Sequence, residues 1–218
     1  MANKAVIAGA SGLIGSELLQ ILLKENFYDE VLILVRKELP IQHKKLVQLV
    51  VDFDQLDKFK HIINGHAIFC CLGSTKSKTP SQRMYRKVDH DYPVKLAQIA
   101  LEHNTPQYHL VSAIGADFKS LTYYNKLKGE TENDVQAIGL PCLHIYRPSL
   151  LTGDRKEYRF AEKVATAVMT VVNPVLIGPL KKYRSIPAAT VARAMYNQSL
   201  KQGEGVYIHP SDHIKQLA

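Results

Sequence analysis

Short apolar runs alternate along most of the chain with segments that carry apolar residues at helical spacing. Residues 4–10 (KAVIAGA) predict a strand that ends in glycine, and residues 13–26 place leucines along one face of a helix. The same alternation continues to residue 210. It predicts strands at 31–37, 45–53, 66–73, 107–113, 141–149 and 205–210, and helices at 81–104 (with Pro93 near a kink), 122–139, 156–172 and 187–201.

The expected strands are almost continuous apolar runs, which is typical of parallel strands that are covered on both faces. Strands that alternate with helices predict an α/β fold with a doubly wound parallel sheet, in which ligands bind at the carboxyl ends of the strands. The length of 218 residues fits a single domain over 1–218. Within it, residues 150–186 are the expected small C-terminal substrate lobe or lid.

Composition and charge exclude several classes of protein. A hydrophobic content of 46% and a charged content of 22% are ordinary for a soluble globular protein. The net charge of +8 comes from scattered lysines and arginines, which favours a solvated surface over a nucleic-acid site. Three cysteines, two of them adjacent, argue against a disulfide framework and for a reducing compartment, and they form no metal-ligand spacing with the histidines.

The N-terminal run and the longest uncharged stretch help to predict the cellular compartment of the protein. The N-terminal apolar run is too short for a secretory signal, so a cytoplasmic location is predicted. The segment Val164–Leu180 carries no charge, but Asn173-Pro174 and Gly178-Pro179 interrupt it. We therefore expect it to form an apolar lid or a subunit interface, and not a membrane span.

A glycine-rich turn, GASGLIG, follows the first expected strand and opens the first expected helix. In this setting glycines permit a tight turn, a close approach of the backbone to a pyrophosphate and close packing of helix on strand. The helix N-terminus adds free N–H groups and a partial positive charge. The sequence therefore predicts a dinucleotide site that includes Gly9, Ser11, Gly12, Leu13, Ile14 and Gly15.

The second expected strand ends in LVRK, with Arg36 and Lys37 where an acidic residue would bind the ribose 2′-hydroxyl of NAD. An arginine at this place suits a 2′-phosphate. Ser11 could add a hydroxyl to the same phosphate. The sequence therefore favours NADP(H) over NAD(H), against the alternative of a surface arginine beyond the strand end.

Two further strand ends are candidates for the cofactor site. Asp52 and Phe53 follow the third expected strand, where Asp52 could accept from the adenine amino group with Phe53 beside the ring, or could equally cap a helix. Cys71, Leu72 and Gly73 end the fourth expected strand, where glycine allows the backbone to approach a cofactor. Cys71 is expected to be a small buried residue and not a nucleophile.

The stretch YYNKLKGE carries the candidate chemistry. Tyr124 and Lys128 are four residues apart and share one helix face, whereas Tyr123 has Leu127 at the corresponding position. Carbonyl reduction needs a proton donor, and a nearby Lys⁺ lowers the pKa of a tyrosine from its usual value of ~10. Ser112, at the end of the fifth expected strand, could hold the substrate oxygen. Lys128 could also hold the nicotinamide ribose.

In their order along the chain, GASGLIG, LVRK, VDF, CCLGS, Ser112 and YNKLKGE resemble the short-chain dehydrogenase/reductase superfamily. The segments KVDHDYPVKLAQIA, YRPSLLTGDR and PAATVARAM resemble its atypical branch, and within it the Tat-interacting oxidoreductase-like proteins. The resemblance covers about Lys4 to Leu200. It implies an NADP-binding Rossmann fold, with Tyr124 as acid, Lys128 as its partner and Ser112 as orienting residue.

The resemblance also places Arg147 and Pro148 at the superfamily's Arg-Pro, where the chain turns toward the substrate. Two positions depart from the pattern of the branch, because Ala113 stands where a second serine is common and Ser149 where a glycine often follows. Some members of the branch act as NADPH-dependent regulators of other proteins, so the resemblance specifies the fold and the cofactor more closely than the substrate.

Two functions remain open from the sequence. One is an NADPH-dependent oxidoreductase that reduces a carbonyl of an unknown small molecule. The other is a regulatory protein that uses NADP(H) to switch a protein partner, with Tyr124 and Lys128 only holding the ribose. A sugar-nucleotide epimerase or dehydratase is disfavoured, because such enzymes usually have a larger C-terminal lobe than the about 70 residues after Arg147. A homodimer or a protein partner is compatible with either function, and neither nucleic acid nor a membrane is expected as a partner.

Overall fold

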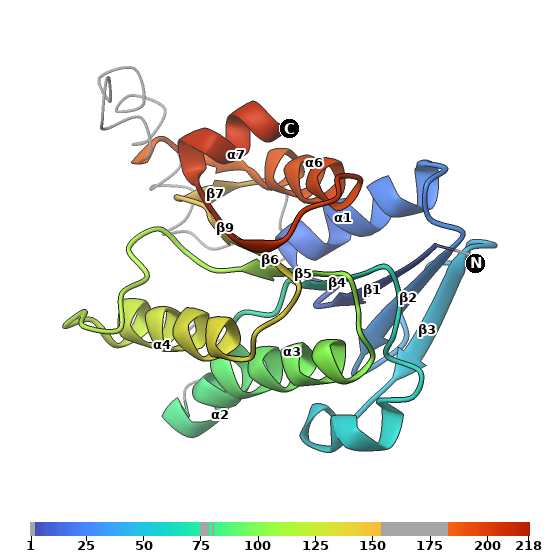
Figure 1. Cartoon of the computed structure of the whole chain (residues 1–218), viewed down its shortest axis with the longest axis horizontal. Coiled ribbons are helices and arrows are strands. Elements are labelled where there is room, and N and C mark those ends of the chain that lie inside the picture. The colour runs from blue at the N-terminus through green and yellow to red at the C-terminus, as the bar shows by residue number, and fades with distance from the viewer. Residues whose placement is uncertain (1–2, 75–78, 80, 154–182) are drawn as a thin grey trace.

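The computed structural model describes residues 3–74, 79, 81–153 and 183–218. A parallel sheet of seven strands forms its centre (Figure 1), which confirms the doubly wound α/β fold. The strands are β1 (Lys4–Ala8), β2 (Glu30–Val35), β3 (Leu46–Val50), β4 (Ala67–Cys70), β5 (Gln107–Val111), β6 (Cys142–Arg147) and β9 (Gly205–Pro210). They lie in the order β3-β2-β1-β4-β5-β6-β9, and each neighbouring pair is parallel. All their carboxyl ends therefore meet at one edge.

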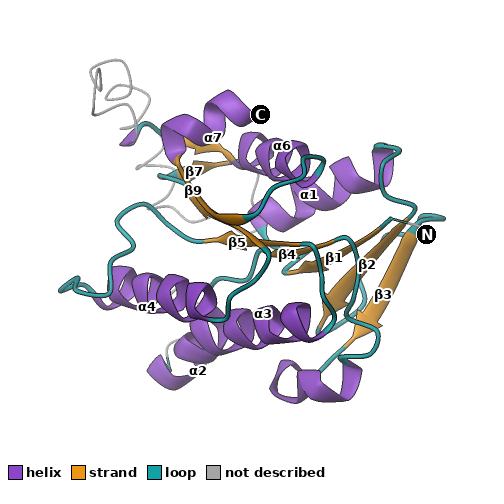
Figure 2. Cartoon of the chain, in the orientation of Figure 1, coloured by secondary structure: helices purple, strands orange, loops and turns teal. Residues whose placement is uncertain are grey.

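Helices cover the sheet in two layers (Figure 2). On one side lie α1 (Leu13–Lys24), α6 (Ala188–Ser199) and α7 (Ser211–Leu217), and on the other lie α2 (Gln82–Arg86), α3 (Tyr92–Glu102) and α4 (Tyr123–Ala137). Because successive strand residues point to opposite faces, Ala5 and Ile7 of β1 join the core under α1 and α6, whereas Val6 and Ala8 join the core under α3. Burial on both faces explains why the strands are apolar throughout.

The expected helix at 81–104 is interrupted. A π-helical turn, Lys87–Asp91, separates α2 from α3, and Pro93 lies in the first turn of α3. The irregularity therefore comes before the proline and not at it. A 3₁₀ helix at Phe53–Phe59 follows Asp52, where a helix cap was one of the two expected interpretations. The helix α7 was not predicted from the sequence, because its seven residues are too few to display a clear helical period.

The two ends of the segment 150–186 lie side by side. β7 (Leu151–Thr152) pairs in parallel with β8 (Ile186–Pro187) beside the main sheet. The expected helix at 156–172 and the uncharged stretch Val164–Leu180 lie wholly outside the described residues. Within the described ranges, no helix has both the length and the apolar character that crossing a bilayer requires.

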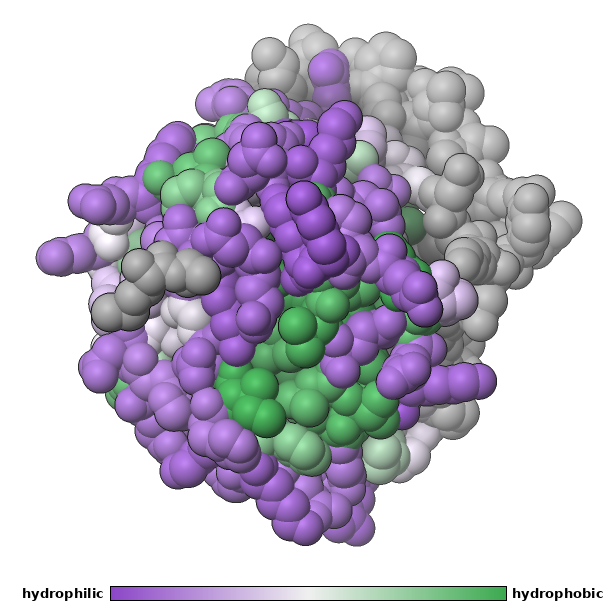
Figure 3. Space-filling model, turned by 90° about the vertical axis from the view of Figure 1, so that its right-hand side faces the viewer, coloured by the Kyte–Doolittle hydropathy of each residue, from purple (hydrophilic) through white to green (hydrophobic). Residues whose placement is uncertain are grey.

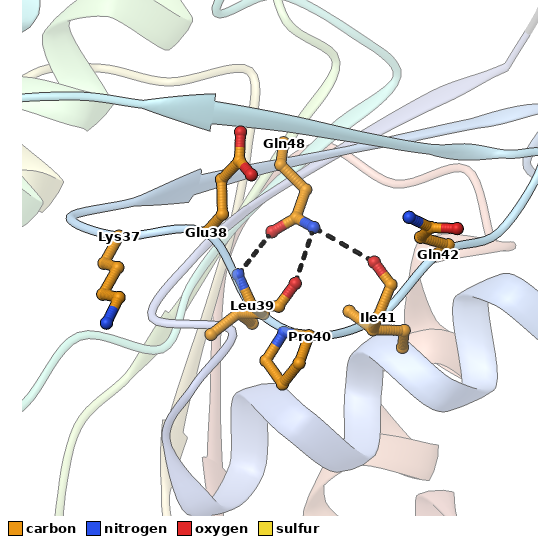
Figure 4. Close-up of a pocket in the computed structure, with 7 residues that line it drawn as sticks. All are labelled: Lys37, Glu38, Leu39, Pro40, Ile41, Gln42 and Gln48. Atoms are coloured by element: carbon orange, nitrogen blue, oxygen red, sulfur yellow. Dashed lines mark hydrogen bonds between the residues drawn. The ribbon is translucent and has the colours of Figure 1, made fainter.

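The crossover from β2 to β3 is a loop, although parallel strands are more often joined through a helix. The side chain of Gln48 on β3 fixes this loop: its Oε1 accepts from Leu39 N, and its Nε2 donates to the carbonyl oxygens of Leu39 and Ile41 (Figure 4). β3 is the end strand of the sheet, and none of the described strands pairs with its outer edge. Val47 and Val50 are exposed there, on the side of the molecule where Figure 3 shows an apolar area.

Candidate active site

The glycine turn packs against the end of β4. Gly9 has a φ of +91°, and a Cβ on it would lie 2.6 Å from the carbonyl oxygen of Cys71. A Cβ on Gly15 would lie 2.2 Å from the carbonyl oxygen of Gly9. Both distances are too short for any side chain, so these two positions require glycine for the close approach of turn, helix and strand.

The N-terminus of α1 is free to bind an anion. Gly12 is its N-cap and provides no side-chain hydrogen bond, and no acidic residue occupies the first turn. The first N–H groups of a helix, here those of Leu13 and Ile14 among others, have no acceptor within the helix. Together with the positive end of the helix dipole, they fit the pyrophosphate of a dinucleotide.

Arg36 and Lys37 follow β2 directly, at the same sheet edge as the glycine turn, and both side chains are exposed, as is that of Ser11. No acidic residue occupies positions 34–37. In Figure 4 the Lys37 side chain points away from Gln48, at the start of a surface pocket lined by Lys37–Gln42 and Gln48. That pocket is built by the β2–β3 loop and does not include the glycine turn.

Asp52 and Phe53 take part in local structure. The Asp52 carboxylate accepts from Asp54 N at 2.9 Å and from Gln55 Nε2 at 2.7 Å, so it caps the 3₁₀ helix, and the capping interpretation is confirmed. Phe53 is buried and packs on Tyr92, with ring centroids 5.4 Å apart. A contact of either residue with adenine stays a prediction.

The residues that follow β4 border the site, and one of them, Gly73, has no side chain. Gly73 is exposed, and a Cβ on it would lie 3.7 Å from Asp89 Oδ1 and 3.9 Å from Lys128 Nζ. Leu72 packs against the core under α3. Burial raises the pKa of the Cys71 thiol, which keeps it protonated and supports the expectation that it is no nucleophile. All three cysteines of the chain are free thiols.

Ser112 follows β5 at the carboxyl edge of the sheet. Its backbone N–H donates to the carbonyl oxygen of Tyr146 at 2.7 Å. Its side chain is buried, yet its Oγ has no hydrogen-bond partner among the described residues. Burying a hydroxyl without a hydrogen bond costs ~1–3 kcal/mol of stability, and a ligand that bonds to Ser112 Oγ would recover this cost.

Tyr124 and Lys128 lie on successive turns of α4 but in different surroundings. Tyr124 is 42% exposed, whereas the Lys128 side chain is 7% exposed. Lys128 Nζ lies 2.9 Å from Asp89 Oδ1 in the π-helical turn. Burial lowers the pKa of Lys128, but Asp89 and Tyr124 raise it by more, so the net shift is upward and the ammonium is charged.

Arg147, at the end of β6, is held by Glu132 of α4. Its Nε lies 3.0 Å and 3.1 Å from the two carboxylate oxygens, and a terminal nitrogen also donates to Glu132. The next residue, Pro148, accepts from Ile114 N at 2.9 Å, which joins the loops after β5 and β6. Ser149 Oγ bonds Ser211 Oγ and the Arg184 carbonyl oxygen. This stretch thus anchors the edge of the site.

Sequence reasoning missed Asp89 and Glu132, the two buried carboxylates that pair with Lys128 and Arg147. A signal for Asp89 was present, because it falls four residues after Tyr85 and seven before Leu96, on the buried face of the helical segment. Glu132 likewise falls four residues after Lys128 on α4. Charged residues at such inward positions are rarely fully buried unless they are paired.

The comparisons with known proteins agree with this geometry. A family model described as NAD(P)H-binding matches residues 9–199. Protein HTATIP2 of Rattus norvegicus is 35% identical over 210 residues, which cover 94% of this chain and 85% of that protein. The mitochondrial protein fmp52 of Aspergillus clavatus is 32% identical over 212 residues, which cover 94% of this chain and 90% of that protein.

Solved structures share the fold. MoeE5 in complex with UDP-glucose and NAD has a TM-score of 0.71 at 14% identity, with 95% of this chain and 75% of that chain covered. A UDP-N-acetylglucosamine 4-epimerase from Methanobrevibacter ruminantium M1 has a TM-score of 0.69 at 17% identity, with 96% and 77% covered. At such identities the likeness shows the Rossmann architecture alone.

One expectation from the sequence was wrong. The absence of a recognisable signal led to a cytoplasmic prediction, but several fungal relatives are named as mitochondrial proteins, which contradicts a purely cytoplasmic assignment. The physical reason for the error is that composition and the length of an N-terminal apolar run do not specify a compartment. The expected superfamily resemblance, in contrast, is confirmed.

The glycine turn, the free α1 N-terminus, the family model and the long matches to relatives all lead to one assignment. The chain belongs to the NAD(P)H-binding family and has the Rossmann fold.

Proposed function

We propose that the protein is an NADPH-dependent reductase of a small-molecule carbonyl, with Tyr124 as the proton donor. The observation that carries the proposal is the buried hydroxyl of Ser112 at the carboxyl edge of the sheet, which has no hydrogen-bond partner within the described part of the chain. The charged Lys128 is seated beside Gly73 at the same edge. A hydroxyl without a partner and a buried ammonium are the groups needed to hold a carbonyl oxygen and a ribose.

The residues divide the work as follows. NADPH, when bound, supplies the hydride. The glycine turn and the first N–H groups of α1 hold the pyrophosphate, and Lys128 holds the ribose next to the nicotinamide. Ser112 donates a hydrogen bond to the carbonyl oxygen and orients it. Tyr124 delivers the proton to that oxygen, and the positive charge of Lys128 favours the tyrosinate that remains.

The preference for NADPH over NADH rests on the end of β2. Arg36 and Lys37 are exposed where a 2′-phosphate would lie, and Ser11 in the glycine turn faces solvent as well. A guanidinium binds a phosphate through charge-assisted, often bidentate hydrogen bonds. Positions 34–37 contain no carboxylate, so no negative charge there repels the phosphate.

Residues 150–186 complete the site in this proposal, within a single domain over 1–218. The β7–β8 pair brings Leu151 and Ile186 together, so the chain between them begins and ends beside the carboxyl edge of the sheet. Ser149 and Arg184 are joined by a hydrogen bond at the same place. A segment tethered there at both ends suits a cover over the substrate.

A screen of NADPH oxidation with aldehydes, ketones and quinones tests the proposal. The wild-type protein should oxidise NADPH with at least one class, and Ser112→Ala should lower that turnover while NADPH affinity stays the same. Ser120→Ala is the matched control, because this hydroxyl lies in the loop before α4 and bonds only its neighbour Thr122 in the described residues. Tight NADPH binding without turnover of any carbonyl would favour a cofactor-dependent switch of a protein partner.

A further inference from the structure

Asp89 is buried at the centre of the candidate site. It is 1% exposed, and its Oδ2 accepts from Ser74 N at 2.7 Å while its Oδ1 lies 2.9 Å from Lys128 Nζ. Its backbone oxygen accepts from the Thr131 hydroxyl at 2.9 Å. The π-helical turn, the loop after β4 and helix α4 therefore all meet at this one residue. Such π-helical turns are frequent at functional sites.

A buried ammonium needs a compensating charge, because burial favours the neutral amine. The titratable groups that influence Lys128 are Asp89 from the π-helical turn, Tyr124 from α4 and Cys70 from β4, and Tyr85 of α2 lies close to Asp89. Burial raises the pKa of Cys70 and of Tyr85, so both are neutral near neutral pH. Among these groups Asp89 is the carboxylate, and it forms the ion pair with Lys128.

The contact between Asp89 and Lys128 leaves the ammonium able to bind a ligand. Asp89 Oδ1 faces Lys128 Nζ as an ion pair but without the angles of a good hydrogen bond. An ammonium has three N–H donors, and Asp89 Oδ1 takes up at most one of them. The bare backbone of Gly73 lies against the pair, so a ligand at this edge can come close to it.

We propose that Asp89 is a positioning residue that keeps the Lys128 ammonium charged and in place for the cofactor. The inference rests on the proposed cofactor role of Lys128. It implies that the cofactor is bound by the Asp89–Lys128 pair and not by Lys128 alone. Asp89 also tempers the effect of Lys128 on Tyr124, because a carboxylate at 2.9 Å offsets part of the field of the ammonium.

The pH dependence of NADPH affinity tests this role in Asp89→Asn. The amide keeps the size of the side chain but removes the charge, so burial dominates and the pKa of Lys128 falls below its usual ~10.4. The ratio of the Asp89→Asn and wild-type dissociation constants should therefore rise by about tenfold or more between about pH 6 and pH 9. The phosphate of the cofactor also titrates in this range, but its effect on affinity is the same for both proteins and cancels in the ratio.

A merely structural role predicts a ratio that stays constant with pH, and that result would overturn the inference. Asp91→Asn is the matched control and should give a constant ratio near one, because Asp91 is half exposed and contacts only His90 and Arg86 among the described residues. If wild-type protein binds no NADPH at any pH, the proposed cofactor itself is wrong. If it binds and only the ratio is constant, the role of Asp89 alone is wrong.

Wild-type protein provides a second test that does not depend on the folding of Asp89→Asn. In protein with ¹³C-labelled lysines, the Lys128 side-chain signal should keep the chemical shift of an ammonium up to a pH above the ordinary lysine pKa of ~10.4. A titration of Lys128 below about pH 9 would contradict the inference. It would mean that Asp89 does not prevent burial from lowering the pKa of Lys128.

Discussion

Arg147 and Glu132 form an ion pair in which both carboxylate oxygens bind one guanidinium. Glu132 is 1% exposed, and Arg147 lies at the end of β6 beside the loops that border the site. The pair joins α4, which carries Tyr124 and Lys128, to the central sheet. It therefore fixes α4 relative to the strand ends.

Loss of this carboxylate should destabilise the protein. Glu132→Gln keeps the side-chain shape but leaves the guanidinium without its counter-charge, so the free energy of unfolding should fall by ~1–3 kcal/mol. Denaturation in urea measures the change. Glu130→Gln is the control on the same helix, because Glu130 pairs with Arg86 near the surface and should contribute at most ~1 kcal/mol. Equal losses in the two variants would contradict the structural role of Glu132.

A row of buried histidines should make stability depend on pH. His109, His144 and His209 stack across β5, β6 and β9, with ring centroids 4.7 Å apart for the first pair and 5.2 Å for the second. His144 Nδ1 and His209 Nε2 are 2.9 Å apart, so one of these rings donates to the other and the accepting ring is neutral. Burial lowers the pKa of His144 and His209 to about 4, and that of His109 falls as well.

The sign follows from the protons that each state binds. Below about pH 6.5 the unfolded chain protonates His144 and His209, whereas the folded protein does not until about pH 4. The free energy of unfolding should therefore fall as the pH decreases from about 6.5 to 4, by up to ~1.4 kcal/mol per pH unit for each histidine. His144→Phe should reduce this slope in urea denaturation, and the exposed His61→Gln should not. An unchanged slope in His144→Phe would exclude His144 as a source of the effect.

Cofactor selectivity should depend on Arg36. A charge-assisted hydrogen bond contributes ~1.5–3 kcal/mol, so Arg36→Ala should weaken NADPH binding by about ten- to hundredfold and leave NADH binding almost unchanged. Calorimetric titration with both cofactors measures the difference. Lys44→Ala, on the exposed part of the β2–β3 loop, should change neither affinity. An equal loss for both cofactors in Arg36→Ala would disprove the assignment of the 2′-phosphate site.

The sequence predicted those features that arise from local pattern. Apolar runs such as 31–37 specify a buried parallel strand, and the GASGLIG turn specifies its own backbone geometry. Pairings between distant segments were not predictable in this way. Asp89 and Lys128 belong to different helical elements, and only packing of the π-helical turn against α4 brings their charges together. The histidine row likewise forms only when β5, β6 and β9 become neighbours.

Tyr124→Phe tests most directly whether Tyr124 donates the proton in carbonyl reduction. The substitution keeps the ring and removes the transferable proton. With any carbonyl that supports NADPH oxidation, turnover should fall by ~10²–10⁴-fold while NADPH affinity changes little. Tyr123→Phe is the neighbouring control, because Tyr123 is similarly exposed, at 40%, but its hydroxyl is directed to the Gln82 carbonyl oxygen. Turnover that falls only in Tyr124→Phe supports the account, and full turnover in Tyr124→Phe would contradict it.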